Sequence, residues 1–248
     1  MSRAELERLD RDARDPAVTL LLLLPLGLLN LAGRSAGDAI SLVETGLQRL
    51  GAPADLVLGS ALAIALVWAI GRVQKLGLAW RGGSVLTIGE GLLWGVVLGP
   101  ALHALTLALP LDQAPLVLQA VDTGEGPGLG ERLLAARQAI AVAAGAGLYE
   151  EVLFRGLLFG GMAIVLRGLF HGVGWPGVSR RLAWTIALIL SSALFAWAHV
   201  YTDPQALEPQ ILTFRFLAGM TFGGLFLWRG LAVVAWAHAG YDALLLLS

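Results

Sequence analysis

The sequence predicts an all-α, polytopic transmembrane bundle of about seven or eight helices. Of its 248 residues, 57% are hydrophobic and only 14% are charged, and the mean hydropathy is +0.74, a combination that soluble domains rarely show. The apolar residues also gather in blocks, most of them close to the ~20 residues that cross a hydrocarbon core. These blocks cover residues 18–31, 54–70, 84–109, 133–166, 182–200, 211–228 and 231–247. Nothing between them is long enough to fold alone, so residues 17–248 are predicted to form one bundle.

The first element is the charged segment at residues 1–16, which carries acids and arginines in mixed order. Ser2 and Glu5 have the spacing of a capping box, so we expect a short helix on the cytosolic side of the membrane. A secretory signal would begin with a basic region, and this segment has at least as many acids as arginines. Basic residues flank the first block and recur after the second, which favours an amino terminus inside the cell.

Two of the apolar blocks are irregular. The first is short and contains Pro25 and Asn30, while the block at 133–166 is much longer than one crossing needs. We therefore expect a break or a turn near Gly145 and Gly147. The Gly-rich segment at 121–131 follows no strand and precedes no P-loop lysine, so it is predicted to be a flexible loop.

Composition excludes several function classes. The chain has no cysteine, which rules out disulfides, thiolate catalysis and thiolate metal sites. Its net charge of -1 argues against a nucleic-acid partner, which would need a basic patch. The expected environment is the lipid bilayer, and the sequence leaves the oligomeric state open.

Ionisable residues inside the last four apolar blocks need an explanation, because a charged side chain at the bilayer centre costs about 2.5–3.5 kcal/mol. Arg215 lies near the end of its block, where its side chain can extend toward the headgroups. Six others stand out: Glu150, Glu151, Arg155, His199, His238 and Asp242. Glu151 and Arg155 are four residues apart, as are His238 and Asp242, so each pair shares one face of a helix.

Glu151 and Arg155 are interpreted as a structural ion pair, since opposite charges on one face stabilise each other in a dry place. Glu150 points about 100° away from Glu151, so it cannot easily share the same arginine. A buried acid outside that ion pair, such as Glu150, is suited to act as a general base. His238 and Asp242 could likewise be a structural pair, but two histidines in separate apolar helices near an acid cluster favour a catalytic site.

Three motifs on successive helices resemble those of a known protease family. They are the acid pair with Arg155 in Glu150-Glu151-Val152-Leu153-Phe154-Arg155, Phe195 with His199, and His238 with Asp242. The order and spacing are similar to the CAAX protease and bacteriocin-processing (CPBP or Abi) family, which includes the type II CAAX prenyl endopeptidases. The resemblance covers about residues 133–248, the expected protease core.

The resemblance implies an intramembrane endopeptidase in which Glu150 activates a water molecule and His199 assists. His238 and Asp242 would stabilise the oxyanion, and Glu151, Arg155 and Phe195 would support the site. Many members carry Asn where this chain has Asp242. Because an ionised carboxylate cannot donate a hydrogen bond, Asp242 is expected to orient His238 instead.

The implied substrate is a membrane-associated protein or peptide, cut near its carboxyl end without a cofactor. The strongly apolar chain with short loops suggests an integral protein of the bacterial cytoplasmic (inner) membrane.

Two alternatives stay open. Glu150, His199 and His238 have the ligand types of a catalytic zinc site, although the His-Glu-x-x-His signature of zinc proteases is absent. A membrane transporter or proton relay would also use buried acids and histidines. Glu90 and His103 in the third block fit that account better, and we interpret them as interior polar residues or as part of the substrate path.

Overall fold

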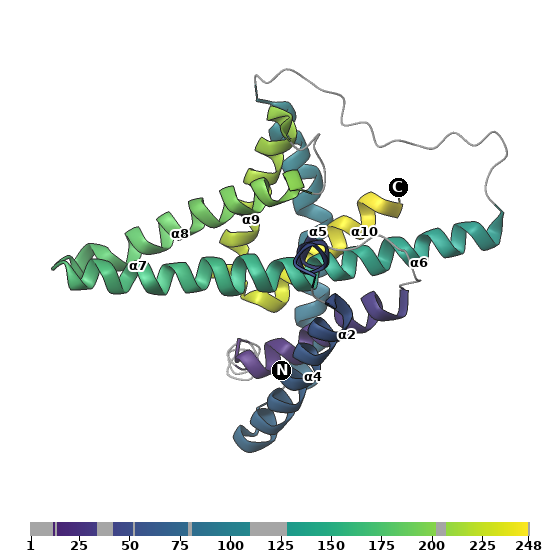
Figure 1. The fold of residues 1–248 in the computed structure, drawn as a ribbon, viewed down its shortest axis with the longest axis horizontal. Helices are drawn as coiled ribbons and strands as arrows, with labels where there is room; N and C mark the ends of the chain where they lie inside the picture. Colours follow the sequence, from purple (N-terminus) through teal and green to yellow (C-terminus); the bar gives the residue numbers. More distant parts are fainter. Residues whose placement is uncertain are drawn as a thin grey trace.

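The computed structural model describes residues 12, 14–33, 42–51, 53–78, 81–109, 128–201 and 207–247. Across these ranges all regular secondary structure is helical, which confirms the predicted fold class (Figure 1). Most of the charged segment at 1–16 and of the Gly-rich segment at 121–131 lies outside the described residues, and so do the expected capping residues Ser2 and Glu5.

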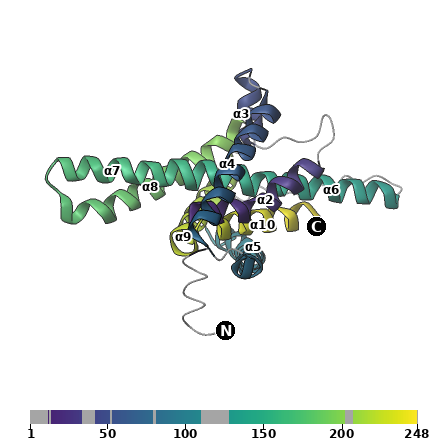
Figure 2. The same cartoon turned by 90° about the horizontal axis from the view of Figure 1, so that it is seen from below.

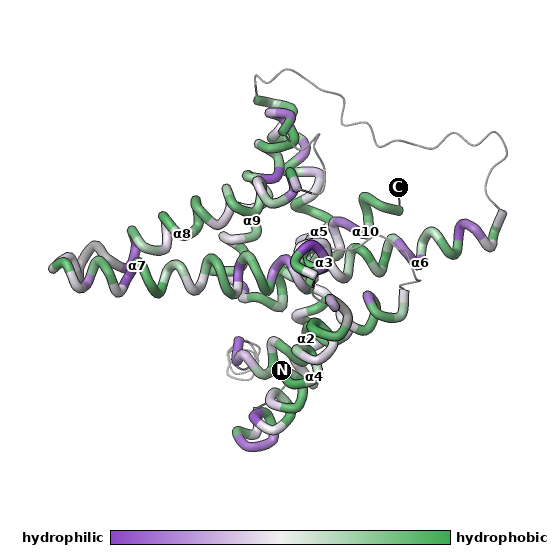
Figure 3. The backbone as a smooth tube through the Cα atoms, viewed as in Figure 1, coloured by the Kyte–Doolittle hydropathy of each residue, from purple (hydrophilic) through white to green (hydrophobic). Residues whose placement is uncertain are grey.

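Each predicted apolar block corresponds to a helix or to a run of consecutive helices. Six helical stretches in the described ranges have the length and composition to cross a membrane, and α10 is a shorter apolar helix. Figure 3 shows their hydrophobic lengths, with hydrophilic residues concentrated toward several helix ends. The helices are α2 (Pro16–Gly33), α4 (Ala54–Leu76), α5 (Arg81–Leu107), α6 (Leu129–Gly145), α7 (Gly161–Gly172), α8 (Pro176–Ala198), α9 (Pro209–Arg229) and α10 (Leu231–Leu247). A short helix that the sequence did not predict, α3 (Leu42–Arg49), precedes α4.

The expected break near Gly145 and Gly147 is wrong. Two π-helical segments, η1 (Ala146–Glu150) and η2 (Val152–Gly160), join α6 to α7. Together they form one continuous helix of 44 residues, Leu129–Gly172, which runs across Figure 1. The chain therefore changes its hydrogen-bonding pattern here rather than its direction, and π-helical turns often occur at functional sites.

The start of α2 is fixed by Asp15. Its Oδ1 accepts a hydrogen bond of 2.9 Å from the Ala17 N–H, and Pro16 occupies the first helical position, where proline is favoured. Arg72 on α4 donates two hydrogen bonds of 3.1 and 3.0 Å to the same carboxylate. The two helices are thus joined by an ion pair at the end of α2.

Pro25 and Asn30 do not interrupt the first apolar block, because α2 continues through both. The Asn30 side-chain amide donates a hydrogen bond of 2.9 Å to the Ala141 carbonyl on α6. It lies beside Gly145, where any side chain would overlap it. Asn30 is therefore a contact between α2 and α6.

Helix α10 lies at the centre of the described bundle. It contacts α2, α5, α6, α9 and η1, and residues 232–239 are all buried. The Trp236 Nε1–H donates a hydrogen bond of 2.9 Å to the Leu22 carbonyl on α2. Figures 1 and 2 both place α10 beside α5 and α6. Neighbours on several sides explain why this short helix is apolar on most of its surface, with His238 and Asp242 as its charged or ionisable residues.

Helices α7 and α8 form an antiparallel hairpin, and α9 crosses α8 (Figure 1). The crossing point of α8 and α9 is at Gly219, where an added β-carbon would lie 2.9 Å from the Ser192 β-carbon. The absence of a side chain at Gly219 lets the two helices approach closely. This contact fixes which residues of α8 and α9 lie at the same level.

Candidate active site

Glu150 and Glu151 are held against α10 by the close approach of two helices at Gly147. A β-carbon at Gly147 would lie 2.7 Å from the Ala239 β-carbon and 2.5 Å from the Ala235 carbonyl oxygen. Only glycine fits this distance without displacing a backbone. One helical turn further along, the acid pair therefore reaches the part of α10 that carries His238.

Glu151 connects two of the three motifs. Its Oε1 lies 3.0 Å from Arg155 Nη1 and accepts a hydrogen bond of 2.7 Å from His238 Nδ1. The Glu151 side chain is 0% exposed. The expected ion pair with Arg155 is present, and the bond to His238 adds a partner that the sequence did not indicate.

The Arg155 guanidinium lies near two aromatic rings. Its Cζ is 4.4 Å from the centroid of Phe195 and 5.6 Å from that of Phe222, within the range of cation–π attraction. Phe222 on α9 also stacks on His238 with centroids 5.1 Å apart. Phe222 could not be identified from the sequence, because one more phenylalanine in an apolar helix carries no distinguishing pattern.

Glu150 faces His199, which directly follows α8 and begins the 3₁₀ turn η3 (His199–Tyr201). Its Oε2 lies 3.6 Å from His199 Nε2, which is too far for a direct hydrogen bond. His199 Nδ1 lies 2.8 Å from the Phe195 carbonyl oxygen. A carbonyl only accepts, so Nδ1 carries a proton and donates. In the neutral ring, the unprotonated nitrogen Nε2 therefore faces Glu150.

Asp242 lies one turn beyond His238, with its Oδ2 3.4 Å from His238 Nε2. Its side chain is 23% exposed, against 7% for His238. The expected role of Asp242 in orienting His238 stays a prediction, and the shorter Glu151 bond to Nδ1 holds the same ring from its other side. Asp242 faces the nitrogen that points away from Glu151.

Arg215 does not extend toward the headgroups as the sequence suggested. One of its guanidinium nitrogens is buried, and its charge interacts with His199. The reason is its position on α9, one turn before Gly219, so its side chain is carried toward the face that packs on α8. Arg215 therefore belongs to the surroundings of the site.

Glu90 and His103 on α5 lie apart from these groups. Glu90 accepts two hydrogen bonds, of 2.5 and 2.6 Å, from Arg229 at the end of α9. His103 is exposed on α5, so the interpretation of His103 as an interior residue is wrong, and a place along a substrate path stays a prediction. Glu90 is a structural contact between two helices.

The possible zinc ligands are not arranged as a metal site. Within the residues described above, no three His, Asp or Glu side chains converge so that they could hold a metal ion. His238 is the main reason, because its two ring nitrogens face Glu151 and Asp242 rather than the space between Glu150 and His199.

The arrangement supplies the groups that peptide hydrolysis requires. A carboxylate and a ring nitrogen face each other across 3.6 Å, and a single water molecule can bridge groups at such a distance. A second imidazole, fixed by a buried carboxylate, lies on the neighbouring helix. Such a set can activate water and donate a hydrogen bond to a developing oxyanion.

Comparison with known proteins agrees with this geometry. Residues 132–244 match the family model described as type II CAAX prenyl endopeptidase Rce1-like, a range that contains all three motifs. No curated protein and no solved structure matches the chain significantly. Over this range, a little under half of the chain, the sequence is similar to the Rce1-like type II CAAX prenyl endopeptidases, which supports an assignment to the CAAX protease family.

Proposed function

We propose that the protein is an intramembrane endopeptidase in which Glu150 activates water for attack on a peptide bond. The observation that carries this proposal is the pair formed by Glu150 Oε2 and His199 Nε2, 3.6 Å apart. Both groups are directed at one small space, and the other nitrogen of His199 is already bonded to the Phe195 carbonyl. A water molecule in this space would be held by two acceptors, with its oxygen available for attack.

In the first step, the water gives one proton to the Glu150 carboxylate while its oxygen bonds to the peptide carbonyl carbon. His199 Nε2 accepts the second hydrogen of the water and thereby aims its lone pair. The carbonyl oxygen becomes an oxyanion, and a protonated His238, whose Nδ1 is held by Glu151, would turn its Nε2 donor from Asp242 to that oxyanion. Asp242 can accept from the same nitrogen before substrate binds.

In the second step, the C–N bond breaks and the leaving nitrogen takes the proton held by Glu150. The products are a carboxylic acid and an amine, so one water molecule is consumed and no other reactant is needed. Glu151, Arg155 and Phe195 do not contact the substrate in this scheme. They hold His238 and His199 in place.

This mechanism uses no metal ion. We therefore expect cleavage to continue after treatment with a strong chelator, measured with the purified protein in proteoliposomes. Loss of cleavage that added zinc restores would contradict this part of the proposal.

The main test compares Glu150→Gln with the unchanged protein for cleavage of membrane-associated peptides in proteoliposomes. We expect cleavage to fall by roughly 100-fold or more, the usual contribution of a general base, with an unchanged melting temperature. Glu131→Gln is the matched control, since Glu131 lies on the same long helix but is exposed. Normal cleavage by Glu150→Gln, or solute flux without any cleavage, would instead favour the transporter alternative.

The family points to substrates whose scissile bond is near the carboxyl end of a membrane-associated protein. Composition and short connections further suggest the bacterial cytoplasmic membrane as its location. Expression as a tagged protein with membrane fractionation tests the location independently of activity.

A further inference from the structure

One hydrogen bond joins α3 to the end of α8. Arg49, the last residue of α3, donates from Nη2 to the Tyr201 carbonyl oxygen across 2.9 Å. Tyr201 closes the turn η3, which begins with His199 and continues directly from α8. Carbonyls in the last turn of a helix have no partner within the helix, and a cation there also interacts favourably with the helix dipole. Arg49 therefore caps this helix end from another part of the chain.

The other end of α3 lies against η1, the segment that ends with Glu150. The two elements are in contact, and Val43 in the first turn of α3 lines the same apolar pocket as Leu148 and Tyr149. The eight residues of α3 span about 12 Å. This short helix thus reaches both η1 and η3, the two elements that carry the Glu150–His199 pair.

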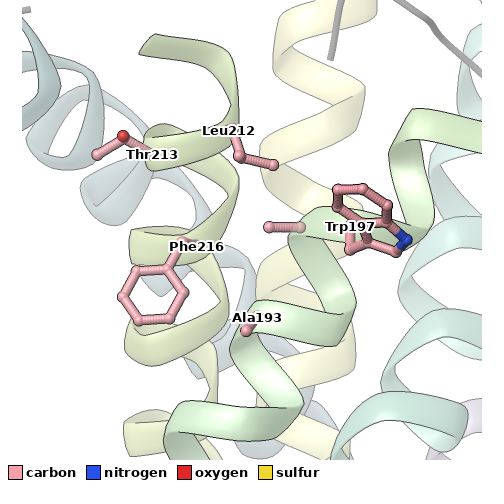
Figure 4. A pocket seen from close by; sticks show the side chains of 6 residues that line it. Ala193, Trp197, Leu212, Thr213 and Phe216 are labelled. Carbon is pink, nitrogen blue, oxygen red and sulfur yellow. The ribbon is translucent and has the colours of Figure 1, made fainter. Parts of the chain in front are cut away.

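The last turn of α8 borders an open crevice on the side of α9. The crevice has a volume of about 350 Å³, with one wall from each helix (Figure 4). It is lined by Ala193, Ala196, Trp197, Leu212, Thr213 and Phe216. The bond from His199 Nδ1 to the Phe195 carbonyl is local and moves together with the helix end. A 3₁₀ turn also has poorer hydrogen-bond geometry than an α-helix, so the bond from Arg49 adds a long-range contact where the local ones are weak.

We propose that Arg49 is a positioning residue for the peptidase reaction. Through Arg49, α3 holds η3 at the distance from η1 that Glu150 and His199 need to share one water molecule. These two side chains lie 3.6 Å apart, and a small shift of η3 would widen that gap. Arg49 acts through the Tyr201 carbonyl and contacts neither the water nor the substrate in this scheme. It lies outside the family match at residues 132–244, and its role rests on the proposed peptidase activity.

The first test is Arg49→Met, which keeps an unbranched apolar stem but removes the donors. In proteoliposomes we expect a kcat roughly tenfold or more below that of the unchanged protein, because a misplacement of about 1 Å can cost about 100-fold. The KM should stay close to the original value. Arg49→Lys keeps a charge and a donor and should recover most of the kcat. Lys75→Met is the matched control, since Lys75 is exposed on α4, and it should leave both constants unchanged.

A double-mutant cycle tests whether Arg49 acts through His199. Arg49→Met should lower kcat in the otherwise unchanged protein but cause no further loss in His199→Ala, because the group that it positions is gone. Equal fold losses in the two backgrounds would overturn the assignment. Tyr201→Ala should cleave normally, since the acceptor is the backbone carbonyl and not the phenol.

Cleavage by Arg49→Met that equals cleavage by Lys75→Met also overturns the positioning role. So does a melting temperature in detergent that falls in step with cleavage in both Arg49→Met and Arg49→Gln, because Arg49 would then act on stability alone. If the unchanged protein cuts no peptide, or if cleavage survives Glu150→Gln, the peptidase proposal fails and the role of Arg49 fails with it.

Discussion

At the scale of single residues, Glu151 is the point where the motifs meet. It contacts both Arg155 and His238, so its removal would affect two helices at once. The sequence predicted the first contact from the four-residue spacing on one helix. The second depends on how α10 packs against η1, which local spacing cannot show.

The buried position of Glu151 predicts that Glu151→Gln acts mainly on stability. Without its charge, Arg155 would remain as a buried cation, and breaking such a pair costs about 3–5 kcal/mol. Thermal unfolding in detergent should show a clear fall in melting temperature. Glu131→Gln, exposed on the same helix, should leave it unchanged. A Glu151→Gln variant as stable as this control would contradict the structural role.

The positions of Phe222 and Arg215 near the site could not be predicted from the sequence. Both lie on α9, which carries none of the three motifs, and no sequence pattern separates them from the other residues of an apolar helix. Phe222 is recognisable only from its stacking on His238. The expectation that Arg215 extends toward the headgroups depends on its distance from a block end. That distance does not show the direction of the side chain.

At the scale of helices, glycine placement decides how closely the elements approach. Gly147→Ala should separate η1 from α10, because its β-carbon would overlap Ala239 and the Ala235 carbonyl. We expect lower stability and lost cleavage, measured by thermal unfolding and the proteoliposome assay. Gly161→Ala on the same helix meets nothing within 4 Å and is the control, with neutral or slightly higher stability. Identical behaviour of the two variants would show that the close approach is unimportant.

The sequence predicted every long helix but not the character of the longest one. Hydrophobic blocks identify membrane helices well. A segment that crosses lipid needs apolar side chains and must satisfy its backbone N–H and C=O groups internally, as a helix does. Glycines at 145 and 147 suggested a break, since glycine usually weakens a helix. Here tertiary packing uses the same glycines as contact points, and the helix continues in π form.

At the scale of the whole molecule, one ion pair makes stability depend on pH. Hydrogen bonding to Arg72 lowers the pKa of Asp15 below its ordinary 3.8, so folding favours the ionised form. The stabilisation is present above that value and is lost as the pH falls through the lower pKa of the folded state. The unchanged protein should therefore melt above Asp15→Asn near neutral pH, and the difference should shrink below about pH 4.

Arg72→Gln provides the control for this prediction, because it removes the same pair from the other side. The double variant should melt like either single one, which thermal unfolding in detergent would show. A difference between Asp15→Asn and the unchanged protein that is constant across the acidic range would mean that Asp15 acts only as a helix cap.

The 44-residue helix also determines how far a substrate must travel. The midpoint of this helix falls between Glu150 and Glu151. These two residues are at the midpoint of the helix at any tilt. With about 1.5 Å per residue, the helix spans roughly 66 Å, more than the ~40–45 Å of a whole bilayer. When this helix is centred on the bilayer, the acid pair lies at the midplane, about 15 Å below the edge of the hydrocarbon core. An extended chain covers about 3.3–3.6 Å per residue. A peptide must therefore thread roughly five unfolded residues below the surface before its scissile bond meets Glu150.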